Sequence, residues 1–209
     1  MKSKLFFILA IGALIGVSYF LNRETNPHEG HHHHDDCGHH HHDDCGHGDD
    51  HDHHAFEEAT FELGATVVVE TDKGSFEFRL YQKDMPITTQ NFVDLATRGF
   101  YDNTAFHRYV EGFVIQGGQG REGEEVPPSI PFEHAEGLVH VPGAVAMARV
   151  GDDYNSASSQ FFVCLNRNEH LDGQFAIFGQ VTSGMEVVEE LREGDGIISV
   201  RIAEASQAQ

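Results

Sequence analysis

The sequence predicts a mainly β domain, a closed barrel or a sandwich with two α-helices packed on it, which begins near residue 61. Short runs rich in β-branched and aromatic residues follow one another, with turn residues between them. Only two segments have a helical pattern, and they lie far apart in the chain. Hydrophobic residues make up 39% of the 209 residues, which is enough for one domain with its own core. This order of elements favours strands that close on themselves beneath two helices.

The first two predicted strands form a hairpin. Thr66–Thr71 and Ser75–Leu80 are rich in β-branched and aromatic residues, and Asp72-Lys73-Gly74 between them is typical of a tight turn. Further strand-like apolar runs lie at residues 113–115, 144–148, 161–165, 176–181 and 197–203.

Two helices are predicted. The first runs from Pro86 to about Arg98 and ends at Gly99, because proline favours the first turn and glycine the position after the last. Its expected apolar side consists of Ile87, Phe92, Leu95 and Ala96.

The second predicted helix covers Met185–Arg192. Ser183 and Glu186 have the spacing of a capping box, in which each side chain bonds a backbone N–H of the first turn. Its expected apolar face consists of Val187, Val188 and Leu191.

The N-terminal segment Leu5–Leu21 is apolar and uncharged, and it follows Lys2 and Lys4. At about 1.5 Å per helical residue it is at the short end of what spans a hydrocarbon core of roughly 30 Å. It is also longer than a usual signal-peptide core, and no small-x-small cleavage motif ends it. We favour residues 1–21 as an uncleaved anchor over a cleaved signal segment. The two lysines place the N-terminus in the cytoplasm and the rest outside the cytoplasmic membrane, in the periplasm or at the cell exterior.

Residues 22–60 have the composition of a flexible tether. Residues 31–38 and 39–46 are the same octad of four histidines, two aspartates, cysteine and glycine, and no apolar residue there builds a core. Imidazole, thiolate and carboxylate suit Zn, Ni, Cu or Co, without selectivity in a flexible chain. A solubilising acidic spacer is the alternative interpretation. The predicted ligands are His31, His32, His33, His34, Cys37, His39, His40, His41, His42, Cys45, His47, His51, His53 and His54.

The net charge of −21 excludes a protein that works on a phosphate backbone, so we expect no nucleic-acid partner. Residues 1–60 hold only three of the 13 basic and 11 of the 34 acidic side chains, so the folded part is acidic as well. The three cysteines, two of them in the repeats, do not form a disulfide framework.

Several familiar catalytic motifs are rejected or missing in the sequence. Gly118–Gly123 matches a dinucleotide-binding pattern, but the prolines at 127, 128 and 131 prevent the helix that this motif requires. The sequence has no lysine-bearing phosphate loop, no Gly-x-Ser-x-Gly and, after residue 60, no His-Glu-x-x-His. The four histidines of this part have no close ligand spacing and are expected at structural or surface positions: His107, His134, His140 and His170.

The most distinctive blocks are Phe106-His107-Arg108, residues 112–118, Ala146-Met147-Ala148, residues 159–163 and Leu171-Asp172-Gly173. In order and spacing the chain from about Thr66 to Ala203 closely resembles the cyclophilin family of peptidyl-prolyl isomerases. The resemblance implies a closed eight-stranded antiparallel β-barrel capped by two α-helices, with the active groove outside the barrel. It also implies catalysis without a cofactor.

By this resemblance Arg108 is the catalytic residue. The positions that match the family's substrate groove are Phe113, Val114, Gln116, Ala148, Arg149, Gln160, Phe162, His170, Leu171 and Phe175. Four of them depart from frequent family residues: His170 from tryptophan, Phe175 from histidine, Val114 from methionine and Arg149 from asparagine. The loop between Val150 and Gln160 is two residues longer. These departures concern substrate preference and cyclosporin affinity more than activity.

The sequence therefore predicts a monomeric isomerase that speeds rotation about X–Pro bonds in exported polypeptides, with a metal-binding tether. Its expected partners are unfolded or partly folded proline-containing chains. His107 is expected to be structural, Phe161 to lie in the core and Cys164 to be a buried apolar residue. The alternative is an extracytoplasmic metal-binding or metal-delivery protein whose barrel binds proline segments with little turnover. A third possibility is that metal on the tether occludes the groove.

Overall fold

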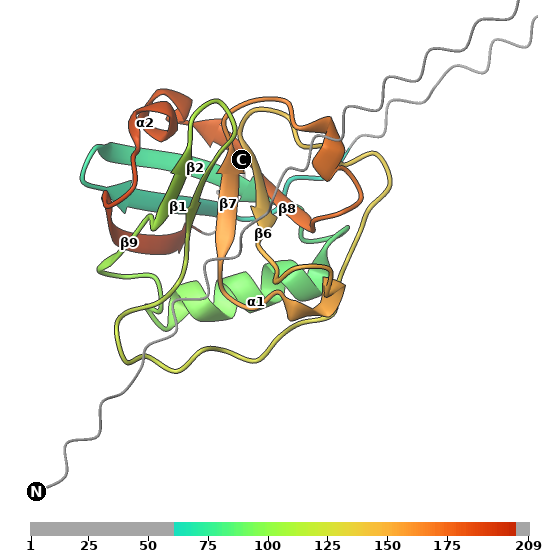
Figure 1. Cartoon of the computed structure of the whole chain (residues 1–209), viewed down its shortest axis with the longest axis horizontal. Helices are drawn as coiled ribbons and strands as arrows, with labels where there is room; N and C mark the ends of the chain where they lie inside the picture. Colours follow the sequence, from blue (N-terminus) through green and yellow to red (C-terminus); the bar gives the residue numbers. More distant parts are fainter. Residues whose placement is uncertain (1–60, 204–209) are drawn as a thin grey trace, which may run out of the picture. The chain divides into compact units, whose positions relative to one another are not determined.

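The computed structural model describes residues 61–203. One antiparallel sheet contains all nine strands of this part, in the order β3-β9-β1-β2-β8-β6-β7-β5-β4. The strands are β1 (Thr66–Thr71), β2 (Gly74–Leu80), β3 (Thr104–Ala105), β4 (Arg108–Val110), β5 (Val114–Gly117), β6 (Ala144–Met147), β7 (Phe161–Cys164), β8 (Ile177–Ser183) and β9 (Gly196–Ala203). The helices α1 (Pro86–Thr97) and α2 (Met185–Glu190) lie at opposite ends of the sheet's central strands (Figure 1). The mainly β fold with two helices is confirmed.

The prediction of eight strands in a closed ladder needs a correction. The sheet's two edge strands, β3 and β4, are separated only by Phe106 and His107. The backbone N–H of Phe106 donates to Asp195 O at 3.0 Å, whereas that of His107 donates to Gln116 O at 3.0 Å. One kinked segment thus changes partner from β9 to β5. Phe106 and His107 therefore join the two edges of the sheet covalently, although β3 and β4 do not pair with each other. The ladder of hydrogen bonds is interrupted there because the N–H of Phe106 points toward Asp195 and that of His107 toward β5.

The predicted hairpin is confirmed as β1 and β2. Thr71 pairs with Gly74, so Asp72 and Lys73 alone form the turn. Gly74 has a φ of +128°, a conformation open to glycine and not to residues with a Cβ. The remaining apolar runs form β5 to β9, and only the short strands β3 and β4 were not foreseen.

Helix α1 begins at Pro86 as predicted, and Gly99 follows its end with a φ of +70°. The expected apolar side was wrong at Ile87, which is 46% exposed. The buried stripe is Thr88, Thr89, Phe92, Leu95 and Ala96, whose spacing matches 3.6 residues per turn, and Ile87 lies outside it. Glu133, from a distant loop, accepts the N–H groups of Ile87 and Thr88 at 3.0 and 2.6 Å.

Helix α2 ends at Glu190, two residues before the predicted end. The capping-box prediction was wrong, because Gly184 precedes the helix in a left-handed conformation and no side chain caps it. A Cβ on Gly184 would lie 2.7 Å from Ser75 O, so close packing against β2 determines how this helix starts.

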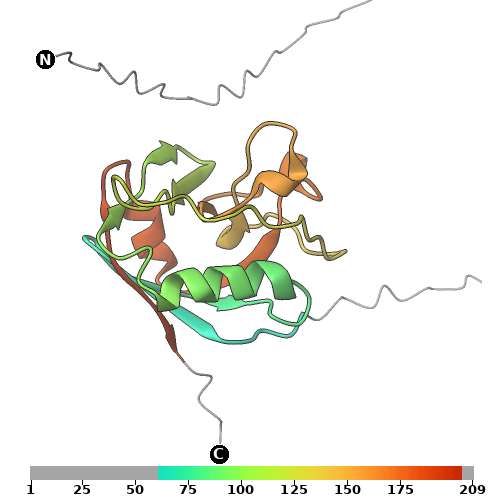
Figure 2. The ribbon, with the colours of Figure 1, turned by 90° about the horizontal axis from the view of Figure 1, so that it is seen from below.

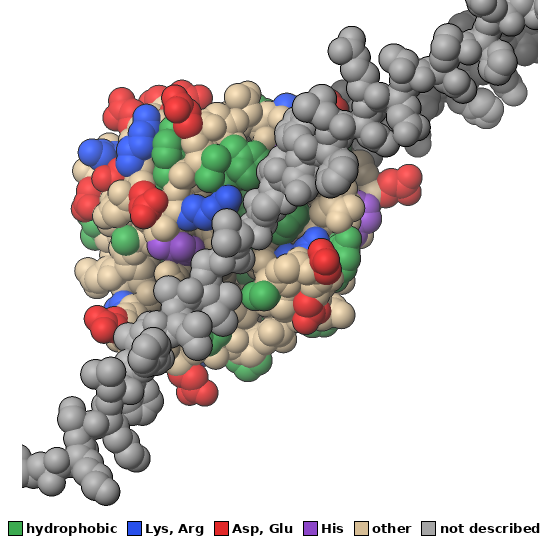
Figure 3. All heavy atoms as spheres, viewed as in Figure 1, with side chains coloured by type: hydrophobic (Ala, Val, Ile, Leu, Met, Phe, Trp, Pro, Cys, Tyr) green, Lys and Arg blue, Asp and Glu red, His purple; other side chains and the backbone are tan. Residues whose placement is uncertain are grey.

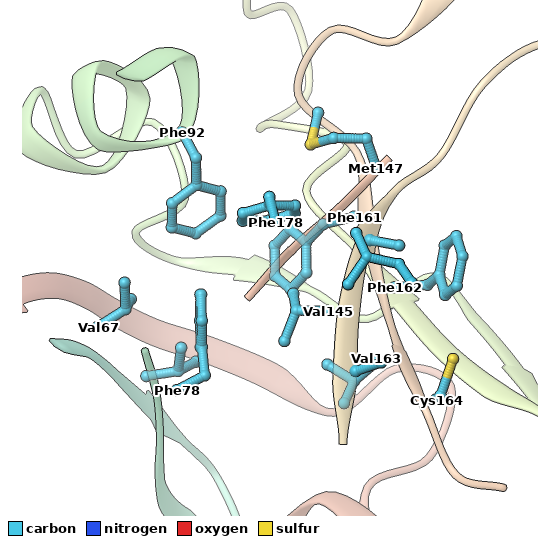
Figure 4. Packing of buried hydrophobic residues seen from close by; sticks show 14 of the residues in the cluster. Val67, Phe78, Phe92, Val145, Met147, Phe161, Phe162, Val163, Cys164 and Phe178 are labelled. Carbon is cyan, nitrogen blue, oxygen red and sulfur yellow. The ribbon is translucent and has the colours of Figure 1, made fainter. Parts of the chain in front are cut away.

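The core is aromatic. Phe92 of α1 lies within 5.6 Å, between ring centroids, of Phe78, Phe161 and Phe178 from three strands. Figure 4 shows Phe161 pointing into this cluster and Phe162, its neighbour on β7, pointing away. Phe161 is fully buried, as predicted. Figure 2 shows α1 lying across one end of the curled sheet. The helix thereby seals the barrel interior and leaves the outer face of β7 for other residues.

Candidate active site

The predicted groove residues meet on the outer face of four adjacent strands. The register pairs Arg108 of β4 with Gln116 of β5, Gln116 with Phe162 of β7, and Phe162 with Ala146 of β6. Residues that face each other across paired strands point to the same side of a sheet. The pairing thus brings the guanidinium, the amide and the aromatic ring into one row.

Polar side chains in this row form a short hydrogen-bonded chain. Arg108 Nη1 donates to Gln116 Oε1 at 3.4 Å, and Gln116 Nε2 donates to Gln160 Oε1 at 2.9 Å. No carboxylate among residues 61–203 forms an ion pair with Arg108. The guanidinium is therefore held in place by a neutral acceptor, and its other N–H groups are available to a ligand.

An apolar surface lies beside the row. Val114, Phe162 and Leu171 are buried, whereas Phe113 is only partly buried. The Phe113 ring stacks on the imidazole of His170 with centroids 5.5 Å apart and planes inclined by 17°. His170 thus takes the place of a second aromatic ring at the rim, and the proline positions expected from the sequence lie together.

A cluster of polar side chains, His140, Asp172 and Arg167, packs against the Phe162 ring through His140. The fully buried His140 stacks on the Phe162 ring at 6.0 Å, and its Nδ1 lies 2.9 Å from Asp172 Oδ1. The same oxygen accepts the backbone N–H of His140 at 2.8 Å, and the other carboxylate oxygen accepts from Arg167. This cluster fixes the ring that the groove presents. The prediction of a structural role for His140 agrees with this geometry.

Burial and hydrogen bonding together set the charge states of His140 and Asp172. Burial lowers the pKa of His140 below 6.5, even though the hydrogen bond to Asp172 acts in the opposite direction. Burial alone would raise the pKa of Asp172, but the hydrogen bonds from Arg167 and His140 outweigh it and lower the pKa to about 2. At pH 7 the pair is therefore a neutral imidazole and a carboxylate, so Nδ1 carries the proton that Asp172 accepts.

Arg149 lies at the far end of the row, in the loop after β6. Its guanidinium carbon is 4.7 Å from the ring centroid of Phe175 and 4.3 Å from that of Tyr154. Phe175 in turn packs edge-on against Phe162 at 5.6 Å. Tyr154 belongs to the loop that is two residues longer than the resemblance predicts, and it lies in none of the motifs that predicted the groove. An aromatic residue inside an otherwise polar loop was the available signal.

Two further groove positions, Ala148 and Gln160, lie next to each other. The backbone N–H of Ala148 donates to Gln160 O at 2.8 Å, which ties the loop after β6 to the start of β7. His107, beside Arg108, is partly buried, and burial lowers its pKa below 6.5. It is thus uncharged at neutral pH, as suits the structural role predicted for it.

Cys164 is fully buried at the end of β7, as predicted, and burial raises the pKa of its thiol to about 11. It is a small apolar residue rather than a nucleophile.

A separate hollow of about 410 Å³ lies between the end of α1 and β9. It is lined by Arg98, Asp102 and Arg201, but no aromatic ring is available there to hold a proline. Asp102 and Arg201 are already paired at 2.8 Å. This hollow therefore lacks the chemistry of the row on the outer face.

Residues 61–203 contain no cluster of three or more side chains suited to hold a metal ion. Within the same range, no helix has the length and apolarity needed to cross a membrane. The predicted anchor, residues 1–21, and the predicted metal ligands between His31 and His54 lie outside the described residues.

Comparison with known proteins connects this geometry to a family. The profile described as cyclophilin-type peptidyl-prolyl cis-trans isomerase matches residues 66–206. A peptidyl-prolyl cis-trans isomerase of Synechococcus elongatus is 38% identical over 143 residues, which cover 65% of this chain and 94% of that protein. Peptidyl-prolyl cis-trans isomerase B of Bacillus subtilis is 39% identical over 134 residues, covering 63% and 92%.

Solved structures are similar as well. A cyclophilin-type isomerase from Cryptosporidium parvum superposes with a TM-score of 0.62 at 26% identity, covering 68% of this chain and 99% of that one. The same enzyme was crystallised in the presence of the dipeptide Ala-Pro, and that structure superposes with a TM-score of 0.61 at 26% identity, covering 67% and 99%.

Proposed function

This chain belongs to the cyclophilin family of peptidyl-prolyl cis-trans isomerases, and we propose that Arg108 is its catalytic residue. Phe113, Val114, Phe162 and Leu171 would hold the substrate proline beside that arginine. The observation that carries this proposal is the single cross-strand row in which Arg108, tied to Gln116, lies beside the ring of Phe162. The Cryptosporidium relative was crystallised in the presence of the dipeptide Ala-Pro, which supports a proline-containing ligand for the groove proposed here.

The reaction requires a twisted amide rather than a broken bond. An X–Pro bond rotates slowly because the C–N bond has partial double character, although its two isomers differ by only ~0.5–1 kcal/mol. In the twisted state the proline nitrogen becomes pyramidal and gains a lone pair. A hydrogen bond from Arg108 to that nitrogen stabilises this state more than either planar isomer, which is what lowers the barrier.

The row suits that task physically. A guanidinium group in a protein is always charged and only donates hydrogen bonds, which suits a donor aimed at the proline nitrogen. The apolar surface excludes water and strengthens the hydrogen bond, and one such donor contributes about 10²- to 10³-fold. Gln116 and the backbone at Arg149 are the candidates to hold the flanking carbonyl. No cofactor and no general base enter this scheme, so the rate should vary little with pH near neutrality.

The test is the cis-to-trans relaxation rate of a proline-containing peptide with the full-length, metal-free chain. We expect Arg108→Ala to lower kcat/KM about 10²- to 10³-fold, whereas Arg98→Ala, at the end of α1, serves as the matched control and keeps the rate. An Arg108→Ala variant as fast as the parent chain would disprove the role of Arg108. Circular dichroism of both variants checks that each is folded.

We further propose that residues 5–21 anchor the chain, so that the isomerase domain works on exported polypeptides outside the cytoplasmic membrane. The proposed division is therefore an anchor at 1–21, a tether at 22–60 and the isomerase domain at 61–209. The uncharged apolar run after two lysines supports this. Alkaline extraction of membranes tests it, because an anchored chain stays with the lipid and a cleaved one is released.

The histidine-rich octads support a second role, the binding of Zn, Ni, Cu or Co by residues 22–60. We expect the full-length chain to bind zinc or nickel at a higher stoichiometry than a variant lacking residues 22–60, measured by equilibrium dialysis. Equal binding by both chains would leave the tether as an acidic spacer. The relaxation rate with and without zinc further tests whether metal on the tether occludes the groove.

A further inference from the structure

Arg149 carries a positive charge that nothing in the described part of the chain neutralises. No carboxylate of residues 61–203 forms an ion pair with it. Asp153, four residues further along the same loop, instead accepts the N–H of Asn155 at 3.0 Å. Arg121, Arg167 and Arg201 do pair with carboxylates of the same part of the chain. Figure 3 shows acidic and basic side chains next to each other at the upper left of the face in view.

The guanidinium is also held rigidly. It lies between the rings of Tyr154 and Phe175, its Nε donates to Gln174 O at 3.0 Å, and its Nη1 donates to Gly151 O. Tyr154 is fixed in turn, because its hydroxyl lies 2.6 Å from Gln174 Oε1 and its ring packs on Phe132 at 5.1 Å. A planar cation stacked in this way has lost its rotational freedom before any ligand arrives.

These contacts leave one nitrogen of the guanidinium, Nη2, without a hydrogen bond to the described part of the chain. The hydrogen bonds that hold the loop do not need Nη2. The two N–H groups of Nη2 form the donor end of a site for an anion, because arginine makes charge-assisted hydrogen bonds to carboxylates and phosphates. In an unmodified polypeptide substrate the anionic side chains are carboxylates.

The distance from the proline site defines which part of a substrate reaches this end. Phe162 and Phe175 are 5.6 Å apart, and Phe175 is 4.7 Å from the guanidinium carbon. An extended peptide advances roughly 3.3–3.6 Å per residue. Together these distances place the guanidinium no more than about three extended residues from a proline that rests on Phe162.

We propose that Arg149, stacked between Tyr154 and Phe175, forms a subsite that binds a carboxylate side chain of the substrate within about three residues of the proline. The isomerase thus prefers acidic residues at that position. This inference rests on the proposed function, because it takes the proline to lie on Phe162. It goes beyond that function by naming a chemical class of substrate.

The experiment compares pairs of peptides that differ only by Glu or Gln, placed in turn at each position from three before to three after the proline. The assay uses the full-length, metal-free chain at low salt. At one of these positions we expect kcat/KM to be about 3- to 10-fold higher for the Glu peptide than for the Gln peptide, because a partly exposed hydrogen bond between charged groups contributes a free energy of this size. The preference should shrink as salt is added, because screening weakens the attraction. The salt series needs no variant.

Variants then test whether Arg149 causes this preference for Glu. In Arg149→Gln the ratio of the Glu to the Gln peptide should fall to about one, whatever happens to the rate with each peptide. Arg149→Lys keeps the charge without the planar stack and should give an intermediate ratio. Arg98→Gln removes one positive charge outside the groove and should keep the ratio of the parent chain.

Two results would overturn the subsite: equal rates for Glu and Gln peptides at every position, or a preference that survives in Arg149→Gln. Both are distinct from failure of the proposed function. That failure would show as no acceleration of either peptide, or as full activity in Arg108→Ala. If turnover is absent, the ratio of dissociation constants for the same peptide pairs, from titration calorimetry, decides the question of the subsite.

Discussion

The inner and outer faces of β5 and β7 are built from alternate residues of the same two strands, yet they have different physical character. Inward, Ile115, Phe161 and Val163 are fully buried and meet other apolar side chains. Outward, Gln116 and Phe162 are register partners in the row with Arg108. A strand of four residues therefore serves the core and the groove at the same time.

The difference teaches that the two faces are stabilised in different ways. The inner face depends on area removed from water and on close packing, which are properties of many residues together. The outer face depends on a few directed contacts, such as the amide chain of Gln116 and Gln160 and the hydrogen bonds between His140 and Asp172 behind Phe162. Substitutions on the inner face should alter stability, and substitutions on the outer face should alter turnover.

The largest expected effect separates the neighbours Phe161 and Phe162. Phe161→Ala should lower the free energy of unfolding by about 3–5 kcal/mol, because it leaves a cavity beside Phe92, Tyr101 and Phe106. Its folded fraction should keep its kcat/KM. Phe162→Ala should cost less stability and raise KM instead, because the proline loses its ring. Urea denaturation and peptide kinetics on both variants measure this, and identical profiles would refute the comparison.

A smaller effect concerns the cluster behind Phe162. The pKa of Asp172 is about 2 in the folded chain, against 3.8 as the ordinary value, so the carboxylate stabilises the fold above pH 4 and this contribution is lost as the pH falls from about 4 to 2. Because the pKa of His140 is lowered as well, stability should already begin to fall below pH 6.5. Asp172→Asn should cost about 1–2 kcal/mol at pH 7 and remove the lower step.

Urea denaturation at pH 7, 5 and 3 measures both steps, and Asp152→Asn, an exposed loop variant, is the matched control. A parent chain equally stable at all three values would contradict this account of the cluster.

The smallest expected effect concerns Gln116. Gln116→Leu removes the acceptor for Arg108 and the donor to Gln160, while Arg108 itself is kept. We expect kcat/KM to fall about 3- to 10-fold, the value of one hydrogen bond to a charged group. The free energy of unfolding should change by less than about 1 kcal/mol, because the side chain is only partly buried. A fall as large as that of Arg108→Ala would mean that Gln116 contributes as much to the twisted state as the arginine does, and would contradict this ranking.

Local sequence patterns predicted correctly those features that depend on a single strand, hairpin or helix. The hairpin at Thr66–Leu80, the start of α1 at Pro86 and the inward position of Phe161 were predicted from neighbouring residues alone. The errors arose where a distant segment intervenes. Ile87 lies at the solvent-exposed start of α1, where Glu133 caps the helix, and the packing of Gly184 on β2 replaces the expected cap of α2.

The sequence by itself determined the fold class and seven of the nine strands that the structure describes, and its resemblance to a family supplied the proposed groove residues. Those features depend on alternation along the chain and on motifs that are contiguous or nearly so. Only the tertiary structure decided that the barrel closes through Phe106 and His107, that His140 and Asp172 support Phe162, and that Tyr154 and Phe175 enclose Arg149. The reason is physical: these contacts join residues far apart in the chain, and their geometry exists only once the sheet has curled and the loops have packed.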